Sequence, residues 1–447
     1  MRRSTTTRMV AIAAATLLLT ITGCSASATS EPTAACQNEI PNKKAPSVEV
    51  WAFYPNFDQV VDEFNATHDD VQVCWVMAGA GADEYNKLNV AFESGTGAPD
   101  VAQLEFDQLP NFIIRDTLVD LSEFGANDVK DDYTAGAWSS VSSDSSVYAI
   151  PVDSGPMGMF YRQDILDAAA IPVPQTWAEF ATAAQQLKDS GSAALFTDWY
   201  TNFGYFTHAI LSQGGWQPFD YDLSNPETIG VDIDSAEGRA VLKYWFDLID
   251  AGLIDTEDRG TTDYQSKLVN GGYATYIAAA WGQKNLLGVE SNDPTAVWRI
   301  APLPQWDIDQ PVAANHGGGG LAVTEQADDP ELAAKVAMEL FGTKEAWDIG
   351  IDQVKLFPTW TPVLESDAFL DSTQEFFGDE TANRDIWYPA AMDFTGTTFS
   401  PVQSYVYDAM RSELVAALEG TITSDEILAN VQTNVVAQLE EQGFTVK

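Results

Sequence analysis

The chain has few residues of the types that bind metals, phosphates and nucleic acids. Only three histidines and three cysteines occur among its 447 residues, and no two histidines have the spacing of metal ligands. Basic residues are also scarce, with 22 Lys and Arg against 66 Asp and Glu, so the net charge is −44 at pH 7. Such a surface repels phosphate and nucleic acid. The composition predicts no metal, no cofactor and no nucleic-acid partner, and it favours a monomer with a neutral or cationic ligand.

Long apolar runs are missing except at the start of the chain, where residues 9–21 follow three arginines. This run is too short to span a bilayer and is typical of a secretory signal peptide. Thr22-Gly23-Cys24 follows and resembles the lipobox of bacterial lipoproteins, in which cleavage leaves the cysteine as an acylated N-terminus. We therefore expect residues 1–23 to be a lipoprotein signal peptide and Cys24 to carry a membrane-anchoring lipid. An ordinary secretory signal is the alternative.

The other two cysteines, Cys36 and Cys74, remain as an even pair in an oxidising compartment. We expect them to form a disulfide, which would stabilise the fold by about 3 to 4 kcal/mol because it closes a loop of about 40 residues. Two separate buried thiols are the alternative. Residues 24–47 are rich in Ser, Thr, Ala and Pro without apolar periodicity, which predicts a flexible tether before the fold.

The length of the chain favours two domains or two lobes rather than one core. Residues 48–53 and 71–76 have strand patterns, and residues 57–65 between them have one apolar helical face. This order predicts a right-handed parallel crossover with ligand sites beyond the carboxyl ends of the strands. A further strand is expected at 99–104, and further helices at 85–94, 177–188, 235–251 and after Asp329. The predicted fold class is α/β.

Short motifs occur in a defined order between residues 97 and 335. They are Gly97-Ala98-Pro99-Asp100-Val101, Leu118-Val119-Asp120-Leu121, Tyr148-Ala149-Ile150-Pro151, Tyr161-Arg162-Gln163-Asp164, Pro174-Gln175-Thr176-Trp177-Ala178-Glu179-Phe180, Ala251-Gly252-Leu253-Ile254, Gly271-Gly272-Tyr273-Ala274, Ala301-Pro302-Leu303-Pro304 and Pro330-Glu331-Leu332-Ala333-Ala334-Lys335. In this order they resemble the family 1 extracellular solute-binding proteins of ABC importers, the group that includes the maltodextrin-binding protein.

The resemblance implies a periplasmic-binding-protein-like fold of type II, in which two lobes joined by a hinge close on a ligand. Each lobe would be discontinuous in sequence. We expect the N-terminal lobe at 46–153 plus 305–345 and the C-terminal lobe at 154–304 plus 346–447. The resemblance also implies a non-enzymatic receptor that serves ABC permease subunits. A lipid on Cys24 would hold it at the extracellular face of the cytoplasmic membrane, as Gram-positive cells do with such receptors.

Aromatic and acidic side chains indicate the class of ligand. The C–H face of a pyranose stacks on an aromatic ring while its hydroxyls donate to carboxylates, and the chain has thirteen tryptophans and fifteen tyrosines. By order along the family pattern, Trp199 and Trp281 are the main stacking candidates, with Asp198 as the acid beside the first. Asp107 follows Pro99-Asp100 at the spacing of a family aspartate that binds sugar hydroxyls.

The remaining candidates lie at strand ends, at the hinge or near the carboxyl terminus. They are Tyr54, Asn56, Glu105, Asp153, Tyr200, Asn315, His316, Gly317, Gly318, Trp360, Trp387 and Phe399. The glycines at 317–320 allow either a close approach of the main chain to a ligand or a tight crossing into a buried strand. Leu104 and Gln108 stand where the maltodextrin receptor has a tryptophan and an arginine, so the ligand need not be an α-glucan.

These patterns predict an anchored receptor that captures a neutral di- to tetrasaccharide and delivers it to an ABC permease. A receptor for a cationic solute such as a polyamine is one alternative, because acids and aromatic rings also cage amines. A secreted glycoside hydrolase is another alternative, because such an enzyme also needs acids beside aromatic rings. Two of its carboxyl groups would have to lie about 5 to 10 Å apart. No acid pair lies in a recognisable catalytic segment.

Overall fold

The computed structural model describes residues 36–447 except 202–203, 224, 288–292 and 294. The expected signal peptide, Cys24 and the first part of the expected tether lie outside the described residues. Within the described part of the chain, no helix has the length and apolar character needed to cross a membrane.

A mixed sheet with the strand order β10-β6-β11-β3-β1-β2, in which β9 also pairs with β6, organises the described residues. Its strands are β1 (Ser47–Trp51), β2 (Gln72–Val76), β3 (Val101–Glu105), β6 (Ile150–Arg162), β9 (Thr275–Ala279), β10 (Trp298–Pro302) and β11 (Asn315–Val323). Strand β1 is parallel to both β2 and β3, which confirms the parallel pairing that the crossover predicts. Smaller sheets contain β4 (Ser142–Ser143), β5 (Ser146–Val147), β7 (Phe219–Tyr221), β8 (Thr228–Val231) and β12 (Thr445–Val446).

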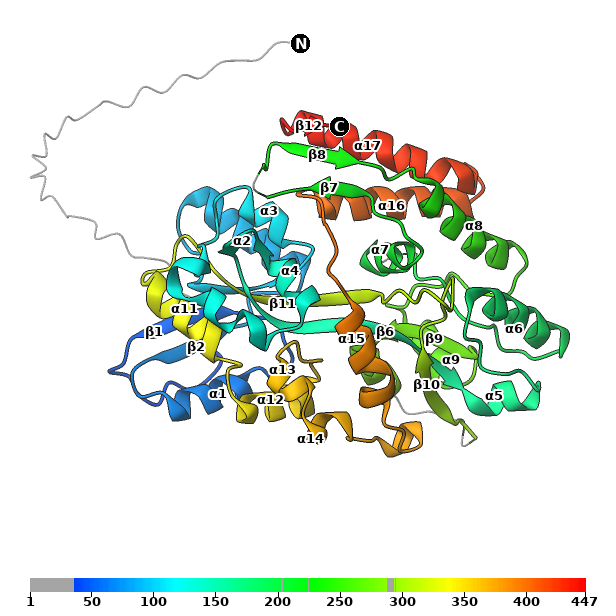
Figure 1. Cartoon of the computed structure of the whole chain (residues 1–447), viewed down its shortest axis with the longest axis horizontal. Helices are drawn as coiled ribbons and strands as arrows, with labels where there is room; N and C mark the ends of the chain where they lie inside the picture. The colour runs from blue at the N-terminus through cyan, green and yellow to red at the C-terminus, as the bar shows by residue number, and fades with distance from the viewer. Residues whose placement is uncertain (1–35, 202–203, 224, 288–292, 294) are drawn as a thin grey trace, which may run out of the picture. The chain divides into compact units, whose positions relative to one another are not determined.

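Strand β6 joins two parts of this sheet. Residues 150–156 pair antiparallel with β11, whereas residues 157–162 lie between β9 and β10. Strand β11 also pairs with β3 and runs beside β6 (Figure 1). We call β2, β1, β3 and β11 with the start of β6 the first half-sheet, and β9, β10 and the end of β6 the second half-sheet.

Helices surround both half-sheets. They are α1 (Asp58–Thr67), α2 (Ala82–Ser94), α3 (Leu109–Ile113), α4 (Ala135–Val141), α5 (Gln163–Ala168), α6 (Trp177–Asp189), α7 (Gly204–Gln213), α8 (Ala236–Asp250), α9 (Thr262–Val269), α10 (Lys284–Leu287), α11 (Pro330–Glu339), α12 (Lys344–Ile349), α13 (Thr361–Leu364), α14 (Asp367–Leu370), α15 (Tyr388–Asp393), α16 (Gln403–Leu418) and α17 (Ile427–Glu441). The expected helices are present, and their starts follow the sequence signals. Thr176 and Glu179 form a capping box at α6, and Asp329 caps α11.

Side chains of the first half-sheet alternate between two cores, because successive strand residues point to opposite faces. Val48 and Val50 face a core shared with α1, α11 and α12. Trp51 and Leu104 face the other core, which α2, α3 and α4 cover. Trp347, Val354 and Val363 also belong to the first of these cores, although we assigned residues 346–447 to the C-terminal lobe. The lobe boundaries remain a prediction.

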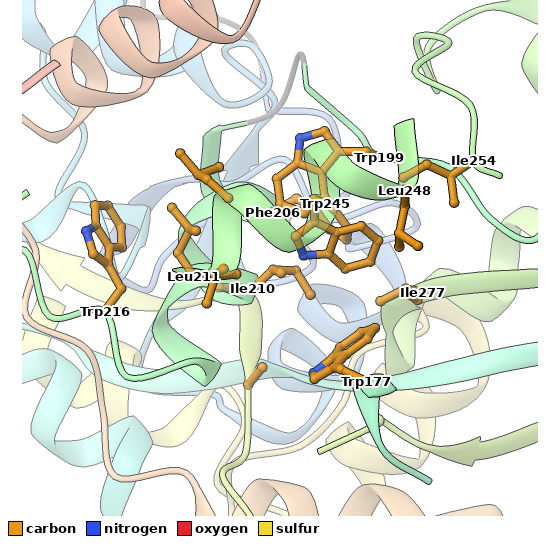
Figure 2. Packing of buried hydrophobic residues seen from close by; sticks show 14 of the residues in the cluster. Trp177, Trp199, Phe206, Ile210, Leu211, Trp216, Trp245, Leu248, Ile254 and Ile277 are labelled. Carbon is orange, nitrogen blue, oxygen red and sulfur yellow. The ribbon is translucent and has the colours of Figure 1, made fainter. Parts of the chain in front are cut away.

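The second half-sheet also has helices on both faces. On one face, α6, α7, α8, α16 and α17 form a core around Met157 and Met159. Tryptophans fill its centre (Figure 2), where the ring of Trp245 lies 4.6 Å from that of Trp199 and 5.2 Å from that of Trp177. On the other face, α9 and α14 pack with Trp387.

Residues 36–46 are attached to the fold, so the prediction of a flexible tether is wrong for this segment. Cys36 forms the expected disulfide with Cys74 in β2. The side chain of Asn38 accepts a hydrogen bond from the Trp75 backbone N–H (2.8 Å) and donates one to the Val73 carbonyl (2.9 Å). Because β2 is an edge strand of the sheet, its outer backbone groups are free to pair with this segment.

Removing the disulfide should lower the free energy of unfolding. The bond joins residues separated by 38 positions, and the chain-entropy relation gives about 4 kcal/mol for a loop of this size. We expect a Cys36→Ala/Cys74→Ala variant to lose about this amount in urea denaturation. An unchanged denaturation midpoint would show that the hydrogen bonds of Asn38 hold the segment without the disulfide.

Candidate functional site

Acidic and phenolic side chains meet where β1 and β3 end against β6. The Tyr54 hydroxyl, after β1, donates a 2.8 Å hydrogen bond to Oδ1 of Asp153 in β6. The Tyr85 hydroxyl, on α2, donates a 2.9 Å hydrogen bond to Oε2 of Glu105 at the end of β3. Asp107 follows in the next loop and is 3% exposed. We call Glu105, Asp107 and Asp153 the acid cluster; it lies at the carboxyl ends of parallel strands, as the crossover predicts.

Burial changes the protonation of the acid cluster. Desolvation, and then the charge of Glu105, raises the pKa of Asp107 to about 8. Desolvation also raises the pKa of Asp153 to about 7, although the hydrogen bond from Tyr54 opposes this shift. The pKa of Glu105 is raised by the same cause. Near neutral pH the cluster therefore retains protons, so its groups can both donate hydrogen bonds to hydroxyl groups and accept hydrogen bonds from them.

Aromatic rings from both half-sheets lie next to the acid cluster. Trp281, in a short 3-10 turn after β9 (η3, Ala280–Gln283), is half-buried, and its indole N–H donates to the His316 carbonyl at 3.0 Å. The ring centroid of His316 lies 5.1 Å from that of Trp281 and 5.6 Å from that of Tyr205. Phe399 packs edge-on to Tyr205 at 5.4 Å. We call Tyr205, Trp281, His316 and Phe399 the ring cluster.

Two of the predicted glycines let β6 and β11 pair closely beside the acid cluster and the ring cluster. We call this pairing of residues 150–156 with residues 315–321 the crossing of β6 and β11. Gly317 and Gly318 have positive φ values of 91° and 102°. A Cβ atom on Gly318 would lie 2.7 Å from the Phe106 ring and 2.9 Å from the Asp153 carbonyl oxygen. Asn315 braces the same crossing, because its side chain accepts from the Gly155 N–H and donates to the Gly317 carbonyl. In this structure they permit the tight crossing of strands, and a close approach of this main chain to a ligand stays a prediction.

Tyr205 connects the two clusters, although no pattern in the sequence pointed to it. Its hydroxyl donates to the Gly317 carbonyl at 3.2 Å. Burial raises its pKa, and the charges of Asp107, Glu105 and Asp153 raise it further, so all three acids lie close to it. Tyr205 belongs to the apolar helix α7, and a mostly buried helix of this kind conceals which of its residues faces a ligand site.

Tyr85 and Lys284 were also missed. Lys284 lies 5.1 Å from the ring centroid of Trp281, and its pKa is lowered by burial while the charge of Asp153 opposes that shift. The signal that identifies Lys284 is its position three residues after Trp281, at a helix start. Tyr85 could be found only through its contact with Glu105.

Contacts between α16 and the Asp107 loop bring the two half-sheets together at the site. The Ser404 hydroxyl donates to the Gln108 side chain at 3.2 Å, and the ring of Tyr407 stacks on that of Tyr205 at 6.0 Å. The hydrogen bond between Ser404 and Gln108 joins residues 296 positions apart in the sequence.

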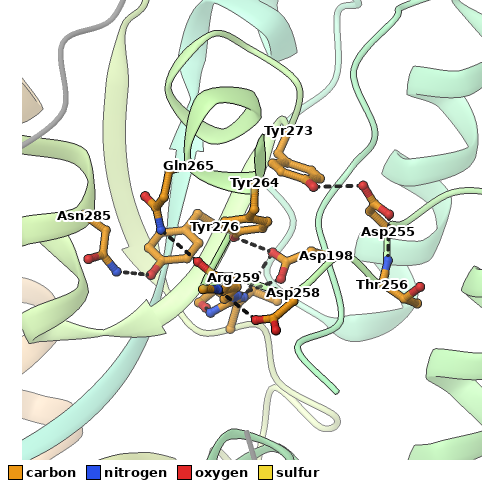
Figure 3. Close-up of polar contacts among 12 residues, drawn as sticks. Asp198, Asp255, Thr256, Asp258, Arg259, Tyr264, Gln265, Tyr273, Tyr276 and Asn285 are labelled. Carbon is orange, nitrogen blue, oxygen red and sulfur yellow. Dashed lines mark hydrogen bonds and ion pairs between the residues drawn. The ribbon is translucent and has the colours of Figure 1, made fainter. Parts of the chain in front are cut away.

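Three predicted site residues lie inside cores instead. Asp198 and Trp199 are both 0% exposed. Asp198 is paired with Arg259 (Figure 3), and Trp199 packs on Trp245 (Figure 2). Trp387 packs on Phe160, on the face of β6 opposite to α7. The structure does not bring these three side chains to the acid cluster.

The last three predicted residues have no contact with the acid cluster among the described residues. Tyr200 is half-buried, and the guanidinium of Arg259 lies 5.3 Å from its ring. Asn56 is exposed and donates to the Gln353 carbonyl. Trp360 is half-buried against the core of the first half-sheet. Across the part of the chain that the structure describes, no three His, Cys, Asp or Glu side chains are grouped to hold a metal ion.

A cavity of about 380 Å³ lies beside the crossing of β6 and β11. It is bounded by the end of α7, by residues 311–315 and by residues 393–398, and Asn315 lines it. Asn315 therefore touches both this cavity and the backbone beneath the ring cluster.

Comparison with known proteins gives relatives along most of the chain. An arabinooligosaccharide-binding protein of Halalkalibacterium halodurans is 26% identical over 343 residues, which are 72% of this chain and 73% of the relative. A lactose-binding protein of Rhizobium radiobacter is 24% identical and covers 89% of this chain and 94% of its own length.

Solved structures share the fold. A binding protein associated with an ABC transporter of B. animalis subsp. lactis, solved with β-1,6-galactobiose, is 27% identical, covers 90% of this chain and 100% of its own, and has a TM-score of 0.75. The galacto-N-biose/lacto-N-biose I-binding protein of Bifidobacterium longum, at 22% identity and a TM-score of 0.76, covers 90% of this chain and 99% of its own and supports the fold. The expected periplasmic-binding-protein-like α/β fold is confirmed.

The family described as bacterial extracellular solute-binding protein matches residues 52–346. This match includes β2, β3, the acid cluster, Trp281 and the crossing of β6 and β11. The chain belongs to the bacterial extracellular solute-binding protein family.

Proposed function

We propose that the chain captures a neutral di- to tetrasaccharide between its two half-sheets and delivers it to the permease of an ABC importer. The observation that carries this proposal is that carboxyl groups of the first half-sheet and the Trp281 ring, which follows β9 of the second half-sheet, meet at one place. Tyr54, Asp107 and Asp153 supply hydrogen-bonding groups, and Trp281 supplies a half-buried ring. The relatives named for arabinooligosaccharides and lactose support this ligand class.

The chemistry of the site suits a polyol. Carboxyl groups exchange hydrogen bonds with vicinal hydroxyls, while Trp281 offers an apolar face to the C–H side of the sugar ring. A ligand that contacts both half-sheets favours the closed arrangement by its differential affinity for the closed and open forms. Since the ligand has no charge, its affinity should depend little on salt. As a member of a solute-binding family, the chain is not an enzyme.

We also propose that Cys24 anchors this receptor outside the cell through a lipid. The family description places its members outside the cell. An uncharacterized lipoprotein of Streptomyces antibioticus is 29% identical over 187 residues, which are 41% of this chain and 40% of the relative. The tether that remains between Cys24 and Cys36 would leave the folded part free to meet a permease.

Calorimetry tests the ligand class. The protein without its leader would be titrated with arabinobiose, β-1,6-galactobiose, lactose and maltotriose, and with spermidine, at low and high salt. We expect at least one saccharide to bind with a Kd of about 1 μM or tighter, with little effect of salt. Binding of spermidine only, weakened by salt, would replace the proposal with a cationic ligand. Release of smaller sugars during incubation would indicate a hydrolase.

A further inference from the structure

We propose that Arg259 is a positioning residue of the ligand site: paired with Asp198, it holds Phe206 against His316, and ligand affinity depends on it although it does not contact the ligand. This inference rests on the proposed function for its affinity test. Asp198, which the sequence suggested as a ligand contact, would then act through Arg259.

Arg259 and Asp198 form a buried bidentate pair. Nε of Arg259 donates to Oδ2 of Asp198 at 2.6 Å, and Nη2 donates to Oδ1 at 3.1 Å. Arg259 is 9% exposed. Its Nη1 donates to the Ile277 carbonyl in β9 at 3.1 Å, and the Tyr264 hydroxyl donates to Oδ1 of Asp198 at 3.0 Å (Figure 3). Such a pair holds one geometry because separating its two charges would leave each of them buried without a compensating partner.

Arg259 contacts aromatic rings through the planar face of its guanidinium, in addition to pairing with Asp198 through its charge. The guanidinium carbon lies 4.7 Å from the ring centroid of Phe206 and 4.8 Å from that of Tyr276. Phe206 comes from α7, and Tyr276 comes from β9. The hydroxyl of Tyr276 is itself held by Asn285 at 2.8 Å. Lysine at position 259 could keep the charge, but it has no planar group to lie between two rings.

Phe206 connects Arg259 to the ring cluster. Its ring centroid lies 5.8 Å from that of His316, which in turn contacts Trp281 and Tyr205. Tyr205 is its neighbour in the first turn of α7, so a shift of Phe206 moves Tyr205 too. The charge of Arg259 also reaches His316, because it adds to the effect of burial in lowering the pKa of that ring to about 3. Arg259 therefore lies directly behind the rings that would face a sugar.

A second buried arginine provides a matched control. Arg162, at the end of β6, is 1% exposed and donates to both carboxylate oxygens of Asp164 at 2.8 and 2.7 Å. Nη2 also donates to Asp293, and the guanidinium lies 5.8 Å from the Trp298 ring. Its partners are outside both the acid cluster and the ring cluster. Arg162 thus matches Arg259 in burial, pairing and ring contact, but not in position.

The experiment compares Arg259→Lys with Arg162→Lys. Both variants should lower the melting temperature, because both lose bidentate bonds. Only Arg259→Lys should raise the Kd for the saccharide, by about tenfold. Only Arg259→Lys should shift the His316 ring signals in NMR spectra, which are simple to assign because the chain has three histidines. If Arg259→Lys does not fold, Phe206→Leu removes the connecting ring and should give the same two effects.

The outcomes separate this inference from the proposed function. If the wild type binds a saccharide and Arg259→Lys binds it equally well, the inference is overturned. An equal rise of Kd in both lysine variants would also overturn it, because the effect would then follow general stability. If the wild type binds no saccharide, the proposed function fails, and the His316 signals still decide whether Arg259 positions the ring cluster.

Discussion

Replacing Trp281 with alanine is expected to raise the Kd for the bound saccharide by about 100-fold, because truncating a central aromatic side chain at a binding surface costs about 2 to 4 kcal/mol. Trp281 is half-buried and is oriented by its hydrogen bond to the His316 carbonyl. Alanine would remove both the stacking surface and this bond. Calorimetry with the best saccharide would measure the change.

Two variants control this result. Trp281→Phe keeps an apolar ring but loses the hydrogen bond to His316, so its Kd should lie between those of the wild type and Trp281→Ala. Trp306 is 38% exposed and packs on Tyr244 at 5.1 Å, away from both clusters. Trp306→Ala should bind as the wild type does. A Trp281→Ala protein with unchanged affinity would remove this ring from the site.

Replacing Glu84 with glutamine is expected to remove much of the pH dependence of folding stability. Glu84 lies in the first turn of α2, it is 0% exposed, and neither carboxylate oxygen has a hydrogen-bond partner. Burial raises its pKa from 4.5 to about 8, and the nearby charge of Lys87 only partly offsets this. The folded protein therefore keeps a proton that the unfolded chain releases above pH 4.5.

The sign of the effect follows from this difference in bound protons. Stability from protonated Glu84 is fully present below pH 4.5 and is lost as the pH rises through about 8. The shift corresponds to a loss on the order of 4 kcal/mol. Asp107 and Asp153, whose pKa values are raised to about 8 and about 7, act in the same direction. The wild type should be less stable in mildly alkaline than in mildly acidic buffer.

Urea denaturation across this pH range measures the difference. Glu84→Gln should show a flatter profile than the wild type, with its largest relative gain above pH 8. The pH dependence of stability that remains in Glu84→Gln should come mainly from Asp107 and Asp153. Glu93→Gln is the matched control, because Glu93 lies exposed on the same helix and should leave the profile unchanged. Identical slopes for Glu84→Gln and the wild type would mean that Glu84 is ionised in the folded protein.

The structure brings together residues that end or follow strands, and their part in ligand binding stays a prediction. Tyr54 follows β1, Glu105 ends β3 and Asp107 follows it, and a strand pattern with a helical crossover is enough to place such residues at one edge of a sheet. The structure brings them to Asp153, as expected. The disulfide could also be predicted from the sequence, because the prediction rests on the even number of remaining cysteines and on the oxidising compartment of an exported chain.

Residues next to helices were predicted less well. Asp198 and Trp199 resemble a ligand-binding acid and ring in the sequence. In the folded chain, however, Asp198 is paired with Arg259 and Trp199 packs on Trp245. Arg259 is 61 positions away from Asp198, and no local signal relates the two residues. Tyr205 was missed for a similar reason, since the side of α7 that meets the acid cluster depends on how that helix packs on β11.

The sequence by itself determined the family, the α/β class and the order of the first strands and helices, and it predicted the pairing of Cys36 with Cys74, which the structure then showed. These properties depend on periodicity, on motif order and on composition, which are local or additive along the chain. Only the tertiary structure decided that Asp198 holds Arg259, that Tyr205 joins the acid cluster to the ring cluster, and that residues 36–46 belong to the fold. Those outcomes depend on which side chains, distant in the sequence, bury one another away from water. Such burial is decided by packing between helices and strands, and no local pattern within one element encodes it.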